Sequence, residues 1–196
     1  MDHNLFYGKY RGKVSDNMDP YGLGRVRAKV PAILVDQDTG WALPSSPYAG
    51  NGVGFFFVPP IDANVWIEFE GGNLNYPILS GCFWDTGEAP QAQTPAIPQV
   101  KVIKTDTATI TLNDIPGEGG TTIESTSGLK IVMNVTGITL SNGTGLAPIR
   151  LNPSSTSNAP TSGNHKMGEL FVDNAGILYY CTQDGTPGIW RKVQLV

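Results

Sequence analysis

"GRVRAKVPAI", residues 24–33, alternates between apolar and basic side chains. On an extended chain the apolar residues share one face and the cations share the other: Val26, Ala28 and Val30 against Arg25, Arg27 and Lys29. Alternation with a period of two is typical of a strand that buries one face. "NVWIEFEGG", residues 64–72, repeats the pattern, with Val65, Ile67 and Phe69 on its apolar side. The two segments predict a sheet with one buried face.

Two further apolar runs complete the N-terminal part of the chain. "FFFVPP", residues 55–60, is ended by two prolines, and we expect Phe55 to Phe57 to belong to the core. "YPILSGCFW", residues 76–84, reads as a last strand that is entered through Pro77. About five strands joined by Gly- and Pro-bearing turns fit a small barrel of the OB type. We therefore predict an OB-fold domain over residues 1–87 that buries its own core.

The composition favours an all-β protein. The 196 residues include 24 Gly and 15 Pro, and apolar positions at helical spacing are always interrupted by one of the two. The net charge of −4 argues against a general affinity for nucleic acid. The first residues lack the apolar run of a signal peptide, so we expect synthesis in the cytoplasm. Cys82 and Cys181 are far apart in sequence and are expected to be small apolar residues rather than a disulfide.

The middle of the chain changes character. A Pro-rich linker is predicted over residues 88–99, and residues 100–152 contain no aromatic side chain. Five strand-like pieces follow one another there: "ATITLND", "TTIESTSG", "LKIVMNVTG", "ITLSNGTG" and "PIRLN". This regularity predicts a β-solenoid or a stacked-strand prism, which needs neighbours to cover its apolar faces. We expect those neighbours to be two more copies of the chain around a three-fold axis.

Residues 153–164 form a second, polar linker, and aromatic residues return in the tail, residues 165–196. The tail is expected to be a compact antiparallel hairpin that caps the stem. Its tip residues would be Leu170, Val172, Tyr179, Tyr180 and Trp190. A unit of this size is marginal alone and could be stable as a trimer.

The N-terminal segments "DPYGLGRVRAKVP" (residues 19–31) and "PPIDANVWIEFEGGNLNYPILSGCFW" (residues 59–84) resemble the OB domain of phage baseplate assembly protein V and VgrG-type spikes of contractile injection systems. The positions that fit this family are Gly24, Arg25, Val26, Pro31, Val65, Phe69, Gly71, Pro77, Gly81 and Trp84. Asn64 stands where the family often has a Gly-Asp turn, and Asn73 replaces a frequent Asp.

The middle segment is similar to the triangular trimeric β-helix that follows the OB domain in this family, most clearly in "SGLKIVMN" and "GITLSNG". The resemblance implies a homotrimeric spike at the centre of a baseplate that caps the inner tube and points at the target membrane. A baseplate hub protein, and a PAAR-like tip protein or an effector, would be its partners. The tail does not match the PAAR pattern and no lysozyme-like insertion is present, so we expect the tail to form the point itself.

The basic residues near the N-terminus are the candidate docking site. Lys9, Arg11, Lys13, Arg25, Arg27 and Lys29 could bind an acidic hub protein. Because OB folds often bind single strands, a nucleic-acid groove is the alternative, although Phe6 and Tyr7 do not interleave with the cations. A glycan platform built from Tyr179, Tyr180 and Trp190 is a further alternative, and packing within the tail is the simpler explanation.

No catalytic or cofactor site is predicted. Neither His3 nor His165 accompanies a Gly-x-Ser-x-Gly elbow, and Glu68 and Glu70 read as a solvated strand face rather than a glycosidase pair. Three copies of His165 could meet at a trimer axis and bind a metal, but a solvated linker histidine is the simpler interpretation. The chain is therefore expected to be a structural protein without an active site or cofactor.

Overall fold

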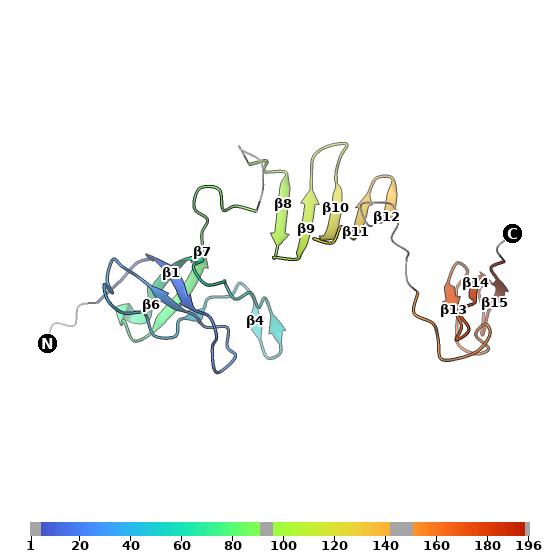
Figure 1. Ribbon diagram of the computed structural model, residues 1–196, viewed down its shortest axis with the longest axis horizontal. Coiled ribbons are helices and arrows are strands. Elements are labelled where there is room, and N and C mark those ends of the chain that lie inside the picture. Colours follow the sequence, from blue (N-terminus) through green and yellow to red (C-terminus); the bar gives the residue numbers. More distant parts are fainter. Residues whose placement is uncertain (1–4, 91–95, 142–150, 195–196) are drawn as a thin grey trace. The chain divides into compact units, whose positions relative to one another are not determined.

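The computed structural model describes residues 5–90, 96–141 and 151–194. Within these ranges the chain is built from strands and one 3₁₀ turn, η1 (Glu70–Gly72), with no α-helix, so the predicted all-β class is confirmed (Figure 1). None of these residues belongs to a helix that could cross a bilayer. The chain divides into two compact units between Thr94 and Pro95, inside the Pro-rich segment.

The N-terminal unit is built on a five-stranded sheet in the order β2-β1-β6-β7-β3. Neighbouring strands are antiparallel except β3 and β7, which are parallel. The bounds are β1 (Tyr10–Asp16), β2 (Arg27–Lys29), β3 (Leu43–Pro44), β6 (Asn64–Phe69) and β7 (Pro77–Cys82). Register shifts interrupt the β1–β2 and β6–β7 pairs, and such bulges increase the bend that a small barrel requires.

One apolar core lies inside this sheet. The two alternating segments provide most of it, because Val26, Ala28 and Val30 are buried from one and Val65, Ile67 and Phe69 from the other. Val14, Ala42 and Leu79 complete the buried cluster. The buried faces expected from the alternation are therefore confirmed.

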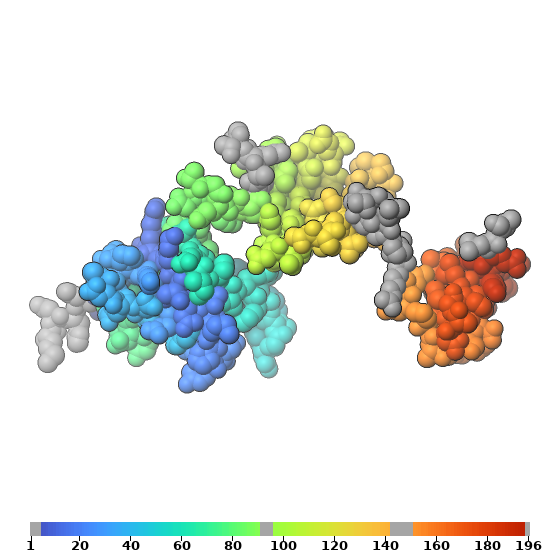
Figure 2. Space-filling view, in the orientation of Figure 1, coloured from blue at the N-terminus to red at the C-terminus, as the bar shows by residue number. Residues whose placement is uncertain are grey.

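The run Phe55–Phe57 does not belong to this core. It follows a small hairpin of β4 (Ala49–Gly50) and β5 (Val53–Gly54), which stands out from the body of the N-terminal unit (Figures 1 and 2). All three rings are exposed, so the expectation that they are core residues is wrong. The chain turns inward only afterwards, where Val58 packs against the core and Pro59 is buried. The barrel interior is already filled by β1, β2, β6 and β7.

A second five-stranded sheet follows, in the order β12-β11-β10-β9-β8. Its strands are β8 (Val100–Lys104), β9 (Ala108–Asn113), β10 (Gly120–Ser125), β11 (Lys130–Asn134) and β12 (Gly137–Ser141). Each pairs antiparallel with the next, so one chain forms a hairpin-connected meander, not the coils of a solenoid. The strand β8 was not among the five predicted pieces, and most of the predicted piece "PIRLN" lies outside the described residues.

The tail contains a three-stranded antiparallel sheet of β13 (Leu170–Val172), β14 (Leu178–Gln183) and β15 (Ile189–Lys192). Asp173 organises the turn between β13 and β14, because its buried carboxylate accepts hydrogen bonds from the amides of Ala175 and Ile177, both at 2.9 Å. The tail therefore contains the expected antiparallel hairpin, β13–β14, and a third strand, β15, that pairs with β14.

Candidate functional site

The meander β8–β12 has no core of its own. None of the described residues 96–141 is buried, whereas the N-terminal sheet buries nine apolar side chains. A sheet with an apolar face is stable when another layer covers that face. The meander is therefore a sheet that its own chain leaves uncovered within the described residues.

The strand register gathers the apolar side chains on one face. Ile123 on β10 is the centre of a row, with Ile110 opposite it on β9 and Ile131 opposite it on β11. The row runs without interruption across all five strands, and we call it the isoleucine row: Ile103, Ile110, Ile123, Ile131 and Leu140. Leu112, Met133 and Ile138 lie two residues along their strands and share the same face.

The other face of the meander has a different chemistry. Its cross-strand rows hold Val102, Thr111, Thr122, Val132 and Thr139, and beside them charged residues such as Lys104, Glu124 and Lys130. Lys130 and Glu124 form an ion pair of 2.7 Å there. A face rich in threonine and charged residues can be solvated. The face that carries the isoleucine row is therefore the one that is stabilised by packing against another layer of protein.

Leaving the isoleucine row uncovered has an energetic cost. Ile103 is 54 % exposed, Leu140 49 %, and Ile123 and Ile131 40 % each. Burying the exposed part of five such side chains is worth on the order of 5 kcal/mol per copy, because complete burial of one contributes about 1.5–3 kcal/mol. That is comparable to the net stability of a small domain, about 5–15 kcal/mol.

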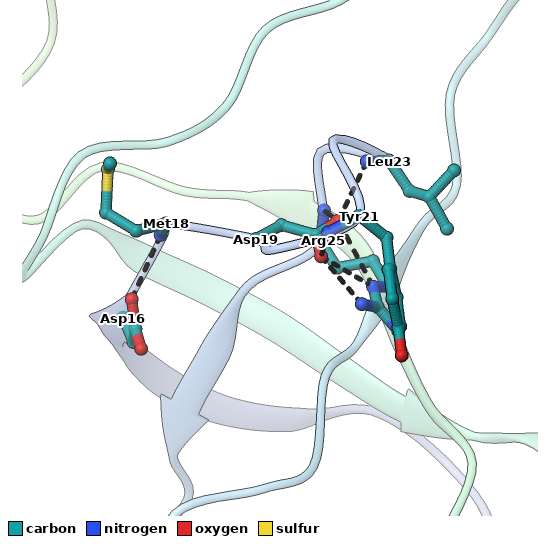
Figure 3. Close-up of polar contacts among 6 residues, drawn as sticks. All are labelled: Asp16, Met18, Asp19, Tyr21, Leu23 and Arg25. Atoms are coloured by element: carbon teal, nitrogen blue, oxygen red, sulfur yellow. Dashed lines mark hydrogen bonds and ion pairs between the residues drawn. The ribbon is translucent and has the colours of Figure 1, made fainter.

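The predicted docking cations are mostly engaged within the N-terminal unit. The guanidinium of Arg25 donates from Nη2 to Oδ1 of Asp19 at 2.6 Å and from Nε at 3.1 Å (Figure 3). The same carboxylate accepts hydrogen bonds from the amides of Tyr21 and Leu23. Because Arg25 and these amides stabilise the ionised form, the pKa of Asp19 lies far below its usual range, and the pKa of Arg25 is raised.

Three more of these cations have partners in their own chain. Lys9 lies 3.2 Å from the carboxylate of Glu68 and also donates to Ser80. Arg27 donates to the carbonyl oxygen of Thr39 at 3.1 Å. Arg11 lies over the rings of Trp66 and Phe83, at 5.5 and 5.4 Å from their centroids. The sequence did not reveal this contact, because Phe83 comes from a segment far from β1.

Lys13 and Lys29 differ from the other cations. They are directly opposite each other on β1 and β2, both are exposed, and neither ammonium group has an anionic partner among the described residues. Like charges in direct cross-strand pairs are destabilising. This pair is thus the part of the basic face that is free to meet an acidic partner.

The predicted tip residues lie on two opposite faces of the tail sheet. Leu170 pairs with Tyr180 and Val172 pairs with Leu178, which places these side chains on one face. Tyr179 and Trp190 belong to the other face, where both rings approach Phe171. Of the three aromatic residues proposed for a glycan platform, Tyr180 is therefore separated from the other two, and Tyr179 is buried.

His165 is held by its own chain. Its Nδ1 lies 2.8 Å from Oε2 of Glu169, its Nε2 lies 3.1 Å from the carbonyl oxygen of Ser162, and its ring meets Trp190 edge-on. Two acceptors favour the doubly protonated ring, and the pKa of His165 is raised, chiefly by Glu169. The described residues contain no cluster of three metal-ligating side chains. The three-fold metal site stays a prediction that this geometry does not favour, and His3 lies outside the described residues.

The two cysteines occupy different environments. Cys181 is buried in the tail, as expected of a small apolar residue, whereas Cys82 is exposed at the end of β7, which differs from that expectation. Both thiols are free. Partial desolvation raises the pKa of Cys82.

Comparison with protein families assigns both five-stranded sheets. The model of the Type VI secretion system/phage-baseplate injector OB domain matches residues 10–84. The model of the phage baseplate V C-terminal trimerisation domain matches residues 100–158. The first match covers the sheet with a buried core, and the second covers the meander that has none. No curated protein gives a significant match.

Proposed function

Since this chain belongs to the phage baseplate V family of injector proteins, we propose that it is the homotrimeric central spike of a contractile phage tail or of a related injection particle. The uncovered isoleucine row carries this proposal. Three copies that turn this face towards a common axis would form the missing core together, in a triangular β-stem. The trimerisation-domain match over the same residues supports self-association through the meander.

The role of such a stem is mechanical. Its apolar contacts would be shared among three chains, so that one chain could not separate without exposing the isoleucine rows of all three. Stability is then linked to assembly, and the stem resists axial load better than three separate sheets would. Contraction of a surrounding sheath would supply the work of puncture, so the spike requires stiffness and no active site. The matched families are structural, which is consistent with a non-enzymatic role.

The two ends of the chain would have different partners. The OB domain would seat the trimer on the baseplate hub at the end of the inner tube. Lys13 and Lys29 are the cations best suited to that contact, because neither has an anionic partner within the described part of the chain. The tail would close the far end of the stem and face the target envelope, with or without a separate tip protein or effector. The assembled particle, rather than the cytoplasm where the chain is made, would be its place of action.

The mass of the full-length protein in solution tests this proposal. Sedimentation or light scattering should give three times the chain mass of 21.0 kDa, and the value should persist on dilution. A folded monomer at micromolar concentration would contradict the proposed stem.

One observation favours a second candidate function. Arg11 on the rings of Trp66 and Phe83 combines a cation with two neighbouring aromatic side chains, a combination that also binds single-stranded nucleic acid. In that case the OB domain would be a nucleic-acid module on a trimeric stalk. Because the guanidinium already occupies these rings and the net charge is negative, we favour the spike.

A further inference from the structure

The hairpin β4–β5 and the residues after it carry an exposed aromatic surface that no function described above uses. Phe56 and Phe57 are each 69 % exposed and Phe55 is 58 % exposed. Leu43, Tyr48 and Val53 are also more than half exposed, and we call these six residues the phenylalanine surface. A shallow groove lies beside it, lined by Pro44, Pro47, Val58, Leu79 and Cys82 as well as the three phenylalanines.

The surface is ordered by contacts within the N-terminal unit. The ring of Phe56 covers Gly24, where a Cβ atom would come within 2.9 Å of the ring, and Gly24 has a φ of +73°. Phe55 and Phe57 stack on each other with centroids 6.3 Å apart. The hydroxyl group of Ser46 donates to the carbonyl oxygens of Tyr48 and Phe55 at the base of the hairpin. These contacts hold the three rings in place while their outer parts remain exposed.

The apolar area that these six residues expose is at the upper end of what a solitary domain exposes in one patch. Taking about 200 Å² for a whole aromatic side chain, the three phenylalanines expose roughly 400 Å². With the other three residues the summed exposed area approaches roughly 650 Å², comparable to the largest apolar patch of a typical monomer, about 300–600 Å² and often functional. A standard interface buries about 800 Å² on each partner. The phenylalanine surface is therefore large enough to form most of one side of a stable interface.

The absence of charge indicates the kind of partner. No charged residue occurs in the sequence between Asp38 and Asp62, although 15 % of the chain is charged. Transient interfaces are about as polar as the rest of a protein surface, whereas interfaces between copies of one chain are more apolar, at about 65 %. An acidic or basic partner would find no counter-charge on this surface. The chemistry fits a permanent contact with a second copy.

We propose that the phenylalanine surface of each OB domain packs against the OB domain of a neighbouring copy, as a second trimer contact separate from the stem. This inference rests on the proposed homotrimer, because the stem supplies the neighbouring copy at a high effective concentration, on the order of millimolar. The contact fixes the position of each OB domain relative to the OB domains of the other two copies. The basic face, with Lys13 and Lys29, then stays available for another protein.

A photo-crosslinker at an exposed ring tests this contact in the full-length chain. Phe57→p-benzoylphenylalanine keeps an aromatic side chain at a position that contributes nothing to the barrel core, and Tyr76→p-benzoylphenylalanine is the matched control on an exposed ring outside the surface. Irradiation of the purified protein should join chains through position 57 but not through position 76. Mass spectrometry should place the crosslink on the OB domain of a second copy.

The outcomes separate this inference from the proposed function. A protein that sediments as a trimer but forms crosslinks only within one chain would overturn the second contact and leave the spike standing. A monomer would overturn the homotrimer, and the second contact with it.

Cys82 provides an independent measurement, because it lines the groove beside the rings. Labelling of this thiol should be slow in the intact trimer and several-fold faster after Phe57→Asp, with trimer mass unchanged. Equal rates in the two proteins would contradict the inference.

Discussion

Ile123 on β10 lies directly opposite Ile131 on β11, and each side chain remains 40 % exposed in its own chain. The pair is the middle of a row that extends to Ile103 at one edge of the meander and Leu140 at the other. In a monomer these contacts would join neighbouring strands but exclude water from neither side chain. The isoleucine side chains would be shielded from water only if another molecule packed against this face.

Ile123→Asp should therefore dissociate the trimer. A carboxylate in the covered row would lose the hydrophobic contribution of the isoleucine, about 1.5–3 kcal/mol in each copy, and would also have to be desolvated. Sedimentation should show monomers or aggregates in place of the trimer.

The matched control is Thr122→Asp, since Thr122 is the adjacent residue on the same central strand and points to the polar face. It introduces the same charge and a similar loss of β-propensity, and it should leave the trimer intact. If both variants kept their trimer mass, or both lost it, the isoleucine row would not be the interface.

The alternating segments show what local pattern predicts well. Period-two alternation assigned the buried faces of β2 and β6 correctly, because a strand has only two sides and the charged residues of these segments all fell on one of them, together with Trp66. The same rule separates neighbouring residues in the tail, where Tyr179 and Tyr180 must lie on opposite faces of β14. A common platform of both rings was therefore already inconsistent with their spacing.

Other features depend on contacts that sequence alone does not reveal. "FFFVPP" has no alternation, so nothing local distinguishes a buried run from one that lies outside a barrel already filled. Arg25 continues the alternating pattern of Arg27 and Lys29, but its partner Asp19 is brought to it by a turn in which Gly22 and Gly24 have positive φ angles. The register that aligns the isoleucine row likewise depends on the lengths of four successive turns.

The Asp19–Arg25 contact predicts acid sensitivity of the OB domain. The carboxylate of Asp19 is almost completely covered, and its pKa is lowered in the folded protein. A lowered pKa means that the contact contributes stability above the ordinary value of 3.8 and loses it as the pH falls below that value. Thermal melts of the intact protein should show this loss between pH 4 and the acid limit of the measurement.

Asp19→Asn should lower the melting temperature of the OB domain by several degrees at pH 7 and flatten its decline in acid, because the amide cannot pair with Arg25 as a carboxylate does. Asp16→Asn is a suitable control, since the carboxylate of Asp16, at the end of β1 just before this turn, accepts a hydrogen bond from the amide of Met18 and has no arginine partner among the described contacts (Figure 3). If the melting temperature of the Asp19 variant declined in acid as steeply as that of the unchanged protein, the Asp19–Arg25 ion pair would not be the cause of the acid sensitivity.

The engaged cations predict weak binding of nucleic acid. Titration of the full-length protein with a single-stranded oligonucleotide at about 150 mM salt should give a Kd weaker than about 10⁻⁴ M, the weak end of non-specific binding. Micromolar affinity with a steep salt dependence, reduced by Trp66→Ala but not by Trp84→Ala, would favour the nucleic-acid function instead. Trp84 is a control of the same residue type, because it is exposed and makes no contact with Arg11 among those described, whereas Trp66 is partly buried beneath Arg11.

The His165–Glu169 pair predicts a pH dependence at the opposite end of the chain. The pKa of His165 is raised above its ordinary value of 6.5, mainly by Glu169, and the pKa of Glu169 is lowered below 4.5, mainly by His165. A raised histidine pKa contributes stability that is fully present below pH 6.5 and is lost as the pH rises through the folded value. A lowered glutamate pKa contributes stability above pH 4.5. The tail should therefore be most stable between these two values and should loosen above neutral pH.

Nuclear magnetic resonance can test this directly, because the chain has only two histidines and His165→Gln identifies the ring signal of the tail. In the full-length protein that signal should titrate above pH 6.5. Glu169→Gln removes the carboxylate but retains an acceptor oxygen, so the pKa should move back towards 6.5 while the sheet persists. Lys166→Gln is the control: it removes a neighbouring charge that pairs with Asp184 rather than with His165, and it should leave the titration above 6.5. A His165 signal that titrates at or below its ordinary value would mean that the imidazolium is not held between Glu169 and Ser162.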